Sequence, residues 1–325
     1  MARQVYRCVI LDDYQGGVLA AGDWSSLEPA VEVEAICEHI AEPARLAERL
    51  QGAAILIAIR ERTALSRDLL ERLPDLKLLV TFGMSNAAID LQAAEELGIT
   101  VCGTTGAGEP TVEMTWALIL SLLRNVPAEA TAFARGGPWQ QTVGTGLFGK
   151  TLGLVGLGRV GRGVARVGHA FGMNVLAYTP TLTTARAEEV GVTAAPHLDM
   201  LLQEADIVSL HLPLNDDTRG LIGKAEIARM KSTAYLINSS RGPIVDEQAL
   251  IEALKARRIA GAALDVFNTE PLPKNHALRG LDNLVATPHL GYVTRENYAR
   301  HAADAIDDIA AWINGKSVRR IVASD

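Results

Sequence analysis

The sequence has few cysteines, no long apolar run and no excess of positive charge. Only three of its 325 residues are cysteines, Cys8, Cys37 and Cys102. Their odd number and apolar surroundings predict buried, reduced thiols rather than a disulfide framework. Lys and Arg number 31 against 38 Asp and Glu, a net charge of −7, so nothing indicates a nucleic-acid or anionic-membrane surface. We expect no metal site, because no Cys and His cluster has the spacing of metal ligands.

Targeting and membrane-spanning segments are not expected either. In the opening stretch, MARQVYRCVILDD, only the four residues CVIL run apolar before two aspartates, which is too short for a signal peptide. The most apolar long segment, 116–123, is broken by Ser121 and followed by Arg124. It falls well short of the roughly 20 apolar residues that a spanning helix requires. We therefore expect a cytoplasmic protein.

What the sequence does contain is a regular alternation of strand-like and helix-like segments, in a chain long enough for about two domains. Several strand-like runs are apolar on both faces, which is typical of buried parallel strands. The pattern predicts an α/β protein with two Rossmann-like, doubly wound parallel-sheet domains. The expected strands are 5–11, 31–37, 54–59, 77–81, 100–102, 151–155, 174–178, 207–212, 234–238, 261–266 and 284–286. The expected helices are 43–50, 66–73, 91–97, 109–133 with an interruption near Pro127, 160–170, 198–203, 247–256 and 298–312.

A glycine fingerprint follows one of these strands. Residues 151–161 read TLGLVGLGRVG, in which Gly156, Gly158 and Gly161 form G-x-G-x-x-G between a strand and a helix. The first glycine permits a tight turn, the second lets a pyrophosphate approach the backbone, and the third lets the helix pack on the strand. The free N–H groups at the helix start favour phosphate. Dinucleotide binding is the interpretation we favour, and a purely structural glycine turn is the alternative.

The position that usually distinguishes NAD from NADP is neutral here. About 20 residues after the fingerprint, an acidic residue would bind the ribose 2′-hydroxyl, but this sequence has Thr179. No carboxylate would then repel a 2′-phosphate, and Arg159, Arg186 or nearby threonines are candidates to contact one. NADP or dual use is modestly favoured, with strict NAD use as the alternative.

Three further strand ends carry polar side chains, namely Arg241, Glu270 and His289. Because ligands bind at the carboxyl ends of strands in a doubly wound sheet, these side chains are expected to converge. Carbonyl reduction leaves negative charge developing on oxygen, which a cation stabilises and a positioned acid protonates. Histidine can both give and take a proton, a neighbouring carboxylate orients it, and arginine binds a carboxylate with two hydrogen bonds. Each residue taken alone is more often a surface or structural group; their joint occurrence favours a site.

With these motifs, the sequence resembles the D-isomer-specific 2-hydroxyacid dehydrogenases, a family that includes D-3-phosphoglycerate dehydrogenase and glyoxylate/hydroxypyruvate reductases. The resemblance extends over essentially the whole chain. It rests on VGLGRVG at 155–161, HLPLNDDTRGLI at 211–222, INSSRGPIVDEQALIEAL at 237–254, ALDVFNTEPLP at 263–273 and TPHLGYVT at 287–294, with TFGMSNAAIDLQAA at 81–94 in the first half.

The resemblance implies a domain organisation and a set of roles. Residues 103–292 would form the dinucleotide-binding domain, and 1–102 with 293–325 a discontinuous substrate domain. His289 would be the acid/base, paired with Glu270, and Arg241 would bind and polarise a 2-keto or 2-hydroxy acid. The expected substrate contacts are Arg60, Gly83, Met84, Ser85, Arg241 and Tyr292. The expected cofactor contacts are Thr111, Gly156, Gly158, Arg159, Val160, Gly161, Thr179, His211, Pro213, Thr218, Asn238, Ser239, Asp265, His289 and Gly291.

Two departures from the family pattern affect specificity. Thr179 replaces the usual aspartate, and Tyr292 stands where a small residue is frequent, which implies a smaller or more aromatic pocket. No regulatory domain is expected after residue 325, so a role in serine biosynthesis is possible but not indicated. The substrate side chain is not specified by the sequence.

Other functions and the assembly remain open at this point. One alternative is a non-enzymatic, corepressor-like dinucleotide sensor that binds partner proteins, and another is formate- or phosphite-type oxidation. The family is usually dimeric through its nucleotide domain, so a homodimer is expected. Trp116, Trp139, Leu147 and Phe148 are the apolar candidates for its interface, unless they pack within one subunit.

Overall fold

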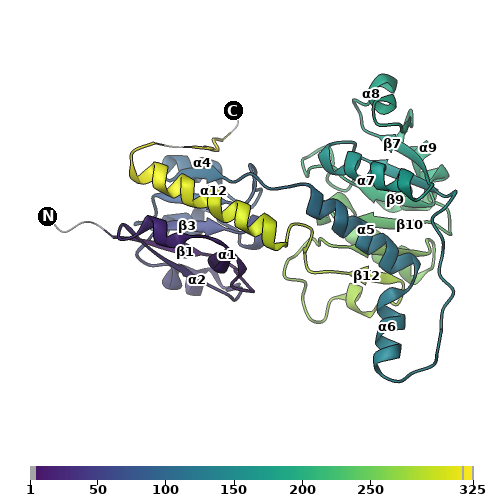
Figure 1. Ribbon diagram of the computed structural model, residues 1–325, viewed down its shortest axis with the longest axis horizontal. Helices are drawn as coiled ribbons and strands as arrows, with labels where there is room; N and C mark the ends of the chain where they lie inside the picture. The colour runs from purple at the N-terminus through teal and green to yellow at the C-terminus, as the bar shows by residue number, and fades with distance from the viewer. Residues whose placement is uncertain (1–4, 317, 324–325) are drawn as a thin grey trace. The chain divides into compact units, whose positions relative to one another are not determined.

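The computed structural model describes residues 5–316 and 318–323; Arg3, part of the opening stretch considered above, lies outside them. The chain divides into two compact units (Figure 1). Unit 1 comprises residues 1–107 and 293–325, and unit 2 comprises 108–292. Residues 103–107 belong to unit 1 because Gly103 ends its last strand and the Ala107 amide donates to Asn297 Oδ1 at 2.9 Å. Which unit binds which ligand stays a prediction.

Unit 1 is built on a five-stranded parallel sheet with the order β2-β1-β3-β4-β5. Helices α2, α3 and α4 cover one face over an aliphatic core, and α12 and α1 pack together, with α12 also against β4. The strands are β1 (Tyr6–Ile10), β2 (Val31–Ala35), β3 (Ala53–Ala58), β4 (Leu78–Thr81) and β5 (Thr100–Gly103). The helices are α1 (Gly17–Ala21), α2 (Pro43–Arg49), α3 (Arg67–Glu71), α4 (Leu91–Glu96) and α12 (Arg295–Ile313).

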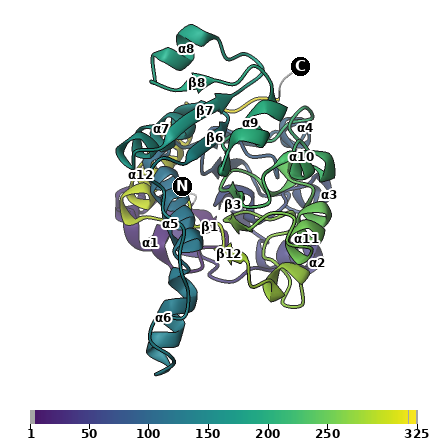
Figure 2. The same ribbon diagram turned by 90° about the vertical axis from the view of Figure 1, so that its right-hand side faces the viewer.

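Unit 2 contains a seven-stranded parallel sheet with the order β12-β11-β10-β9-β6-β7-β8. One core packs α5 and α7 against the sheet, and a second packs α9, α10 and α11 (Figure 2). The strands are β6 (Thr151–Val155), β7 (Asn174–Tyr178), β8 (Thr193–Ala194), β9 (Ile207–Leu210), β10 (Tyr235–Asn238), β11 (Gly261–Leu264) and β12 (Leu284–Ala286). The helices are α5 (Glu109–Leu123), α6 (Val126–Ala134), α7 (Arg159–Ala170), α8 (Thr184–Glu188), α9 (Leu198–Glu204), α10 (Lys224–Arg229) and α11 (Glu247–Lys255).

The strand order of unit 2 reverses at β6, which pairs with β7 on one side and with β9 on the other. In a doubly wound sheet this switch point opens a crevice at the carboxyl ends of the strands, and ligands bind there. The loops after β6, β9, β10, β11 and β12 all emerge at this edge, because every pairing in the sheet is parallel.

The predicted fold class is confirmed, since both sheets are parallel and covered by helices. Short elements were not anticipated: α1, α8, α10 and the two-residue strand β8. The long helix expected over 109–133 is two helices, broken at Asn125, whose φ of +53° is left-handed. Of the three cysteines, Cys8 and Cys102 are buried but Cys37 is exposed, so the expectation of three buried thiols is wrong for Cys37.

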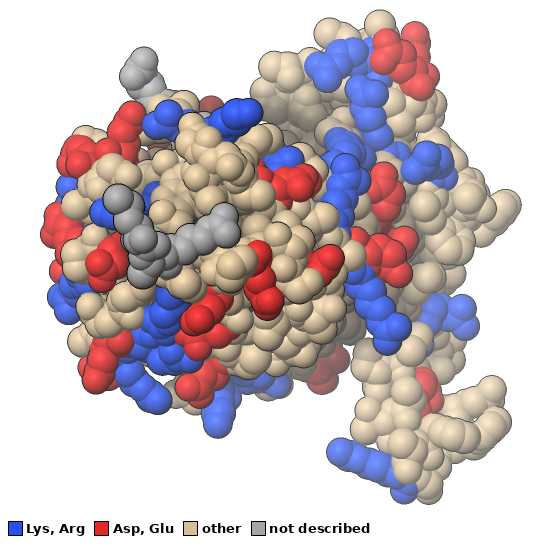
Figure 3. All heavy atoms as spheres, turned by 60° about the vertical axis from the view of Figure 1, so that its left-hand side comes forward, with Lys and Arg blue, Asp and Glu red and all other residues tan. Residues whose placement is uncertain are grey.

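Surface features agree with the balanced composition. On the face drawn in Figure 3, Lys and Arg side chains are scattered among Asp and Glu side chains on a surface made mostly of other residues. Within the described residues, no helix has the length and apolar character to cross a membrane. The same residues hold no group of three or more His, Cys, Asp or Glu side chains arranged to bind a metal ion.

Candidate functional site

The glycine fingerprint forms a tight turn between β6 and α7. Gly156 has a φ of +107°, and a Cβ there would overlap the carbonyl group of His211 after β9. A Cβ at Gly161 would overlap the carbonyl oxygen of Gly156. Gly158, by contrast, is exposed, and a Cβ built on it meets no atom within 4 Å. Two glycines therefore permit the close packing of the turn, while the third leaves open space beside the start of α7.

This open space suits a dinucleotide phosphate. It adjoins the first turn of a 12-residue helix, α7, whose initial N–H groups have no intrahelical acceptors and attract anions. Arg159 is exposed as the first residue of α7 and its guanidinium lies against Gly108. The second strand, β7, ends at Tyr178, and the half-buried Thr179 follows it directly. The residues present therefore fit a bound dinucleotide with a neutral side chain at its ribose position.

His211 borders the fingerprint turn in a neutral form. Its Nε2 atom lies 2.9 Å from Ser209 Oγ, and its backbone amide donates to Val155 at 2.8 Å. Burial lowers the pKa of His211 to about 4, because a charged imidazolium loses its hydration there. Farther along the same loop, Thr218 Oγ1 donates to the Pro213 carbonyl at 2.7 Å.

Glu270 and His289 lie in hydrogen-bonding contact in unit 2. His289 Nδ1 lies 2.7 Å from Glu270 Oε2, and the two side chains are 13% and 23% exposed. The other carboxylate oxygen of Glu270 accepts the Phe267 amide at 2.8 Å. Tyr292, which is buried, meets the His289 ring edge-on with centroids 5.4 Å apart. The imidazole is therefore held on two sides and remains partly open to solvent.

Asp265 fixes the backbone that carries His289. Its carboxylate accepts hydrogen bonds from Thr287 Oγ1 at 2.6 Å, the Leu290 amide at 2.8 Å and the Gly291 amide at 2.7 Å. His289 itself has a left-handed φ of +55°. Burial raises the pKa of Asp265, while these hydrogen bonds act in the opposite direction. A fourth hydrogen bond to this loop comes from Thr111 Oγ1, which donates to the Gly291 carbonyl at 3.0 Å.

Arg241 lies in the loop after β10, the strand next to β11 in the sheet. It follows β10, while Glu270 follows β11 and His289 follows β12, and these three strands are adjacent in the sheet. A Cβ at Gly242 would overlap the Phe267 backbone, so the Arg241 loop packs directly on the segment that orients Glu270. Asn238 Nδ2 donates to the Arg241 carbonyl at 2.9 Å, and the buried Ser239 bonds Thr115 Oγ1 at 2.7 Å.

The expected substrate contacts other than Arg241 and Tyr292 lie in unit 1. Arg60 has a φ of +58° and donates from Nη1 to the Phe82 carbonyl at 3.3 Å, while Gly83 has a φ of +92°. Met84 and Ser85 are exposed at the carboxyl end of β4. Within the described part of the chain, the Met84 and Ser85 amides donate no hydrogen bond. A cationic side chain thus lies beside a loop with two N–H groups that have no acceptor among the described residues, a combination that suits an anion.

The structure also contains residues that the sequence interpretation missed. Asp265 was expected near the nicotinamide, and its hydrogen bonds to the His289 loop were not anticipated. Thr287 was passed over, although it directly follows a strand and precedes the Pro-His pair. Thr104 and His301, which support the Gly83 loop, lie outside every motif quoted above, and Asn86 lies within the motif at 81–94 but was given no role.

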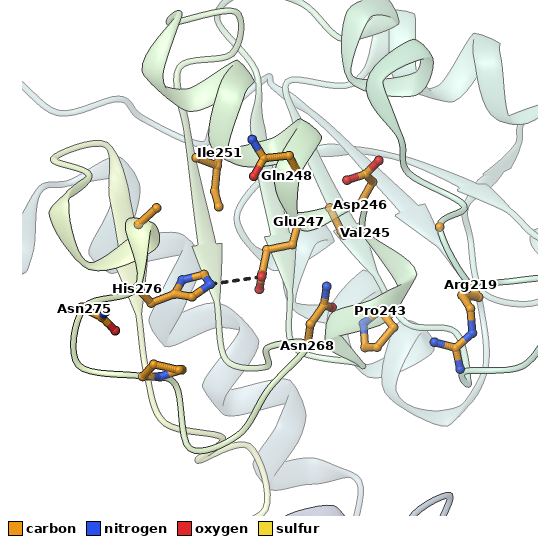
Figure 4. A pocket seen from close by; sticks show the side chains of 13 residues that line it. Arg219, Pro243, Val245, Asp246, Glu247, Gln248, Ile251, Asn268, Asn275 and His276 are labelled. Carbon is orange, nitrogen blue, oxygen red and sulfur yellow. Dashed lines mark ion pairs between the residues drawn. The ribbon is translucent and has the colours of Figure 1, made fainter.

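A pocket of about 730 Å³ on unit 2 is a different feature (Figure 4). It is lined from the loops after β10 and β11 by Pro243 and Asn268, and from α11 by Glu247. Glu247 Oε1 lies 3.3 Å from His276 Nε2, the pair joined by a dashed line in Figure 4. None of Arg241, Glu270 and His289 lines this pocket, so it is not the cavity of the candidate site.

Comparisons with known proteins agree with this geometry. The family model for the D-isomer specific 2-hydroxyacid dehydrogenase NAD binding domain matches residues 116–291. The chain is 43% identical over 259 residues to glyoxylate reductase of Aeropyrum pernix, covering 77% of each chain. It is 40% identical over 301 residues to D-3-phosphoglycerate dehydrogenase of Methanocaldococcus jannaschii, covering 91% of this chain but 56% of that protein. The chain thus spans little more than half the length of the latter.

A solved structure supports the same relationship. The phosphoglycerate oxidoreductase of Vibrio cholerae superposes with a TM-score of 0.91 at 34% identity, covering 96% of this chain and all of that one. Sequence and fold therefore agree over nearly the full length. The chain belongs to the D-isomer specific 2-hydroxyacid dehydrogenases, a family of NAD(P)-dependent oxidoreductases, with NAD or NADP as its cofactor.

Proposed function

We propose that this protein reduces a 2-keto acid to a D-2-hydroxy acid, with His289 as the acid/base. The observation that carries the proposal is the 2.7 Å contact between His289 Nδ1 and Glu270 Oε2. The Phe267 amide holds the second Glu270 oxygen, so the carboxylate is fixed while the imidazole Nε2 atom is left to exchange a proton with a ligand.

The proton and the electrons take separate routes in this reaction. Bound NADH or NADPH would supply the hydride to the keto carbon. As the C=O bond becomes a C–O bond, negative charge develops on oxygen and His289 Nε2 donates its proton there. Glu270 stabilises the imidazolium before the transfer. In the reverse direction His289 takes the hydroxyl proton back.

Arg241 would bind the substrate and polarise its carbonyl group. Its loop packs on the Phe267 segment that orients Glu270, so one backbone contact couples the positions of the cation and the acid. A guanidinium can form two parallel hydrogen bonds to a planar carboxylate or keto-carboxylate, which an ammonium cannot.

We assign the substrate carboxylate to the Phe82–Asn86 loop of unit 1, making unit 1 (residues 1–107 with 293–325) the substrate domain and unit 2 (residues 108–292) the dinucleotide-binding domain. Arg60, Gly83, Met84 and Ser85 would form the carboxylate site, because the loop combines two amides that have no acceptor among the described residues with a neighbouring guanidinium. Tyr292, whose ring lies against His289, would limit the size of the substrate side chain.

The fingerprint of unit 2 would hold the pyrophosphate at Gly158 and the start of α7. The remaining proposed cofactor contacts are Thr111, Arg159, Val160, Thr179, His211, Pro213, Thr218, Asn238, Ser239, Asp265 and Gly291. NADP or dual use is favoured, since the neutral Thr179 follows β7 where a carboxylate would exclude a 2′-phosphate.

We also propose a homodimer in the cytoplasm, with segment 126–148 of unit 2 as the contact surface. Helix α6 has no buried residue and extends away from α5 (Figure 2). Phe133, Trp139 and Phe148 are 72%, 79% and 88% exposed, an unusual cost for a monomer surface. Trp116 and Leu147 are not available, because both are buried within unit 2.

Substitution of the proton donor tests the chemistry. His289→Ala is expected to lower kcat for 2-keto acid reduction by about 10²–10⁴-fold, with little change in NADH affinity measured by fluorescence titration. Glu270→Gln, which removes the negative charge beside Nδ1, should also lower kcat, but by less than His289→Ala. Asp246→Asn, at a capping carboxylate of α11 outside the site, is the control. Near wild-type rates for His289→Ala on every active 2-keto acid would contradict the assignment.

Thr179→Asp tests the cofactor proposal. An introduced carboxylate would accept a hydrogen bond from the ribose 2′-hydroxyl and repel a 2′-phosphate, so kcat/KM for NADPH relative to NADH should fall at least about ten-fold. Thr181→Asp places the same charge two residues away, on an exposed turn, and should change the ratio far less. An equal ratio in wild type and Thr179→Asp would remove Thr179 from cofactor selection.

Light scattering tests the assembly. At micromolar concentration we expect twice the 34.7 kDa chain mass, and the double variant Phe133→Asp, Trp139→Asp should shift the protein towards monomer. Leu97→Asp, at a 39% exposed leucine of unit 1, should leave the mass unchanged. A wild-type mass near that of one chain would refute the dimer.

A further inference from the structure

A small buried polar group supports the Gly83 loop from inside unit 1. The Thr104 hydroxyl oxygen lies 2.6 Å from His301 Nδ1, 3.2 Å from the Gly83 amide and 3.2 Å from the Thr81 carbonyl. Thr104 is fully buried and His301 is 2% exposed. One hydroxyl thus connects α12 to the first residue of the loop.

The His301 ring is immobilised by its surroundings. It stacks on Phe82, with ring centroids 4.2 Å apart and an interplanar angle of 15°. On its other edge the backbone of Gly106 comes so close that a Cβ there would lie 2.8 Å from the ring. Because Phe82 immediately precedes Gly83, the stack and the Thr104 hydrogen bond act on adjacent residues of the loop.

The protonation state defines the direction of these hydrogen bonds. Burial lowers the pKa of His301 to about 4; the charges of Arg60 and Arg300 act in the same direction, and Asp304 opposes them. The ring is therefore neutral at pH 7. The Thr104 hydroxyl donates to the Thr81 carbonyl, and its oxygen accepts from the Gly83 amide and from the Nδ1–H of the neutral His301 ring.

The loop has one further anchor at its other end. Asn86 Nδ2 donates to the Arg60 carbonyl at 2.7 Å and to Thr81 Oγ1 at 2.9 Å. Between the two anchors lie the exposed Met84 and Ser85, whose amides face no acceptor in the described structure. The direction of those amides therefore depends on how Gly83 is held, and Gly83 has a left-handed φ of +92°.

We propose that Thr104 and His301 are positioning residues for substrate binding: by holding the Gly83 amide they orient the Met84 and Ser85 amides towards the substrate carboxylate. The inference rests on the proposed function, which assigns the carboxylate to this loop. The proposal adds two buried residues that affect substrate affinity: Thr104, which directly follows β5, and His301 on α12. Both are remote in sequence from the Gly83 loop. Neither residue touches substrate or cofactor in this account.

Four variants test the proposal. Thr104→Val removes the hydroxyl at constant shape, and His301→Phe keeps a stacking ring but removes the Nδ1 hydrogen bond. Each should raise KM for the active 2-keto acid about ten-fold, the effect of losing one productive hydrogen bond, with KM for the cofactor and kcat changed less than about two-fold. Thr104→Ser should restore the wild-type KM. Thr105→Val, whose hydroxyl bonds Asp304 instead, is the matched control.

Two further measurements separate positioning from folding. The double variant Thr104→Val, His301→Phe should raise KM no more than either single change, since both break one connection. Oxamate affinity, measured calorimetrically on the NADH-loaded protein, should fall by the same factor as 1/KM. A role in stability alone would lower Tm and the active fraction and leave KM unchanged. If the wild type reduces a 2-keto acid but the variants keep its KM and its oxamate affinity, this inference alone is overturned. If the wild type reduces no 2-keto acid, the proposed function and this inference are overturned together.

Discussion

The structure depends on one constraint: every strand of each sheet runs in the same direction. In unit 2 this brings the loops after β6, β9, β10, β11 and β12 to a single edge, so residues separated by up to 133 positions in sequence, such as Gly156 and His289, lie at the same edge of the sheet. The helices follow from the same constraint, because parallel strands need crossovers, and the crossovers cover both faces. The candidate site is therefore a consequence of the topology before any single side chain is considered.

Buried polar groups then convert this coarse arrangement into fixed geometry. Asp265 is buried and accepts three hydrogen bonds from the loop that carries His289, and Thr104 with His301 does the equivalent for the Gly83 loop. In both cases a group that is costly to bury is satisfied by the backbone or side chains it orients. These hydrogen bonds stabilise the left-handed backbone conformation of His289 in one loop and of Gly83 in the other, a conformation that is costly without such support.

Much of this was predictable from the sequence, and the physical reasons are visible. The strands β6, β7 and β12 have the predicted bounds. An apolar run that is bounded by polar or glycine residues leaves few other positions where the strand could begin and end. The pairing of Glu270 with His289 was also anticipated, because each lies in the loop after one of two adjacent strands. The short elements α8, α10 and β8 were missed, since one or two turns bury too few residues to leave a periodic pattern.

The support of the loops could not be read from the sequence. Thr104 and His301 are 197 residues apart, belong to no motif, and meet only because α12 returns to the first unit. The interruption expected near Pro127 is found two residues earlier, at Asn125, whose left-handed backbone angle is one that Asn tolerates but does not require. Local patterns specify elements and their ends, whereas contacts across the fold decide which buried side chain supports which loop.

The central claim is that a hydride from the bound nicotinamide would reach C2 of a 2-keto acid and give the D-2-hydroxy acid. The most direct test is reduction of an active 2-keto acid with cofactor carrying deuterium on the transferred position of C4, followed by mass and chiral analysis of the product. The account predicts one deuterium, bound at C2 of the D-2-hydroxy acid, and none exchanged with water. A product of L configuration, or one whose C2 hydrogen comes from solvent, would contradict it.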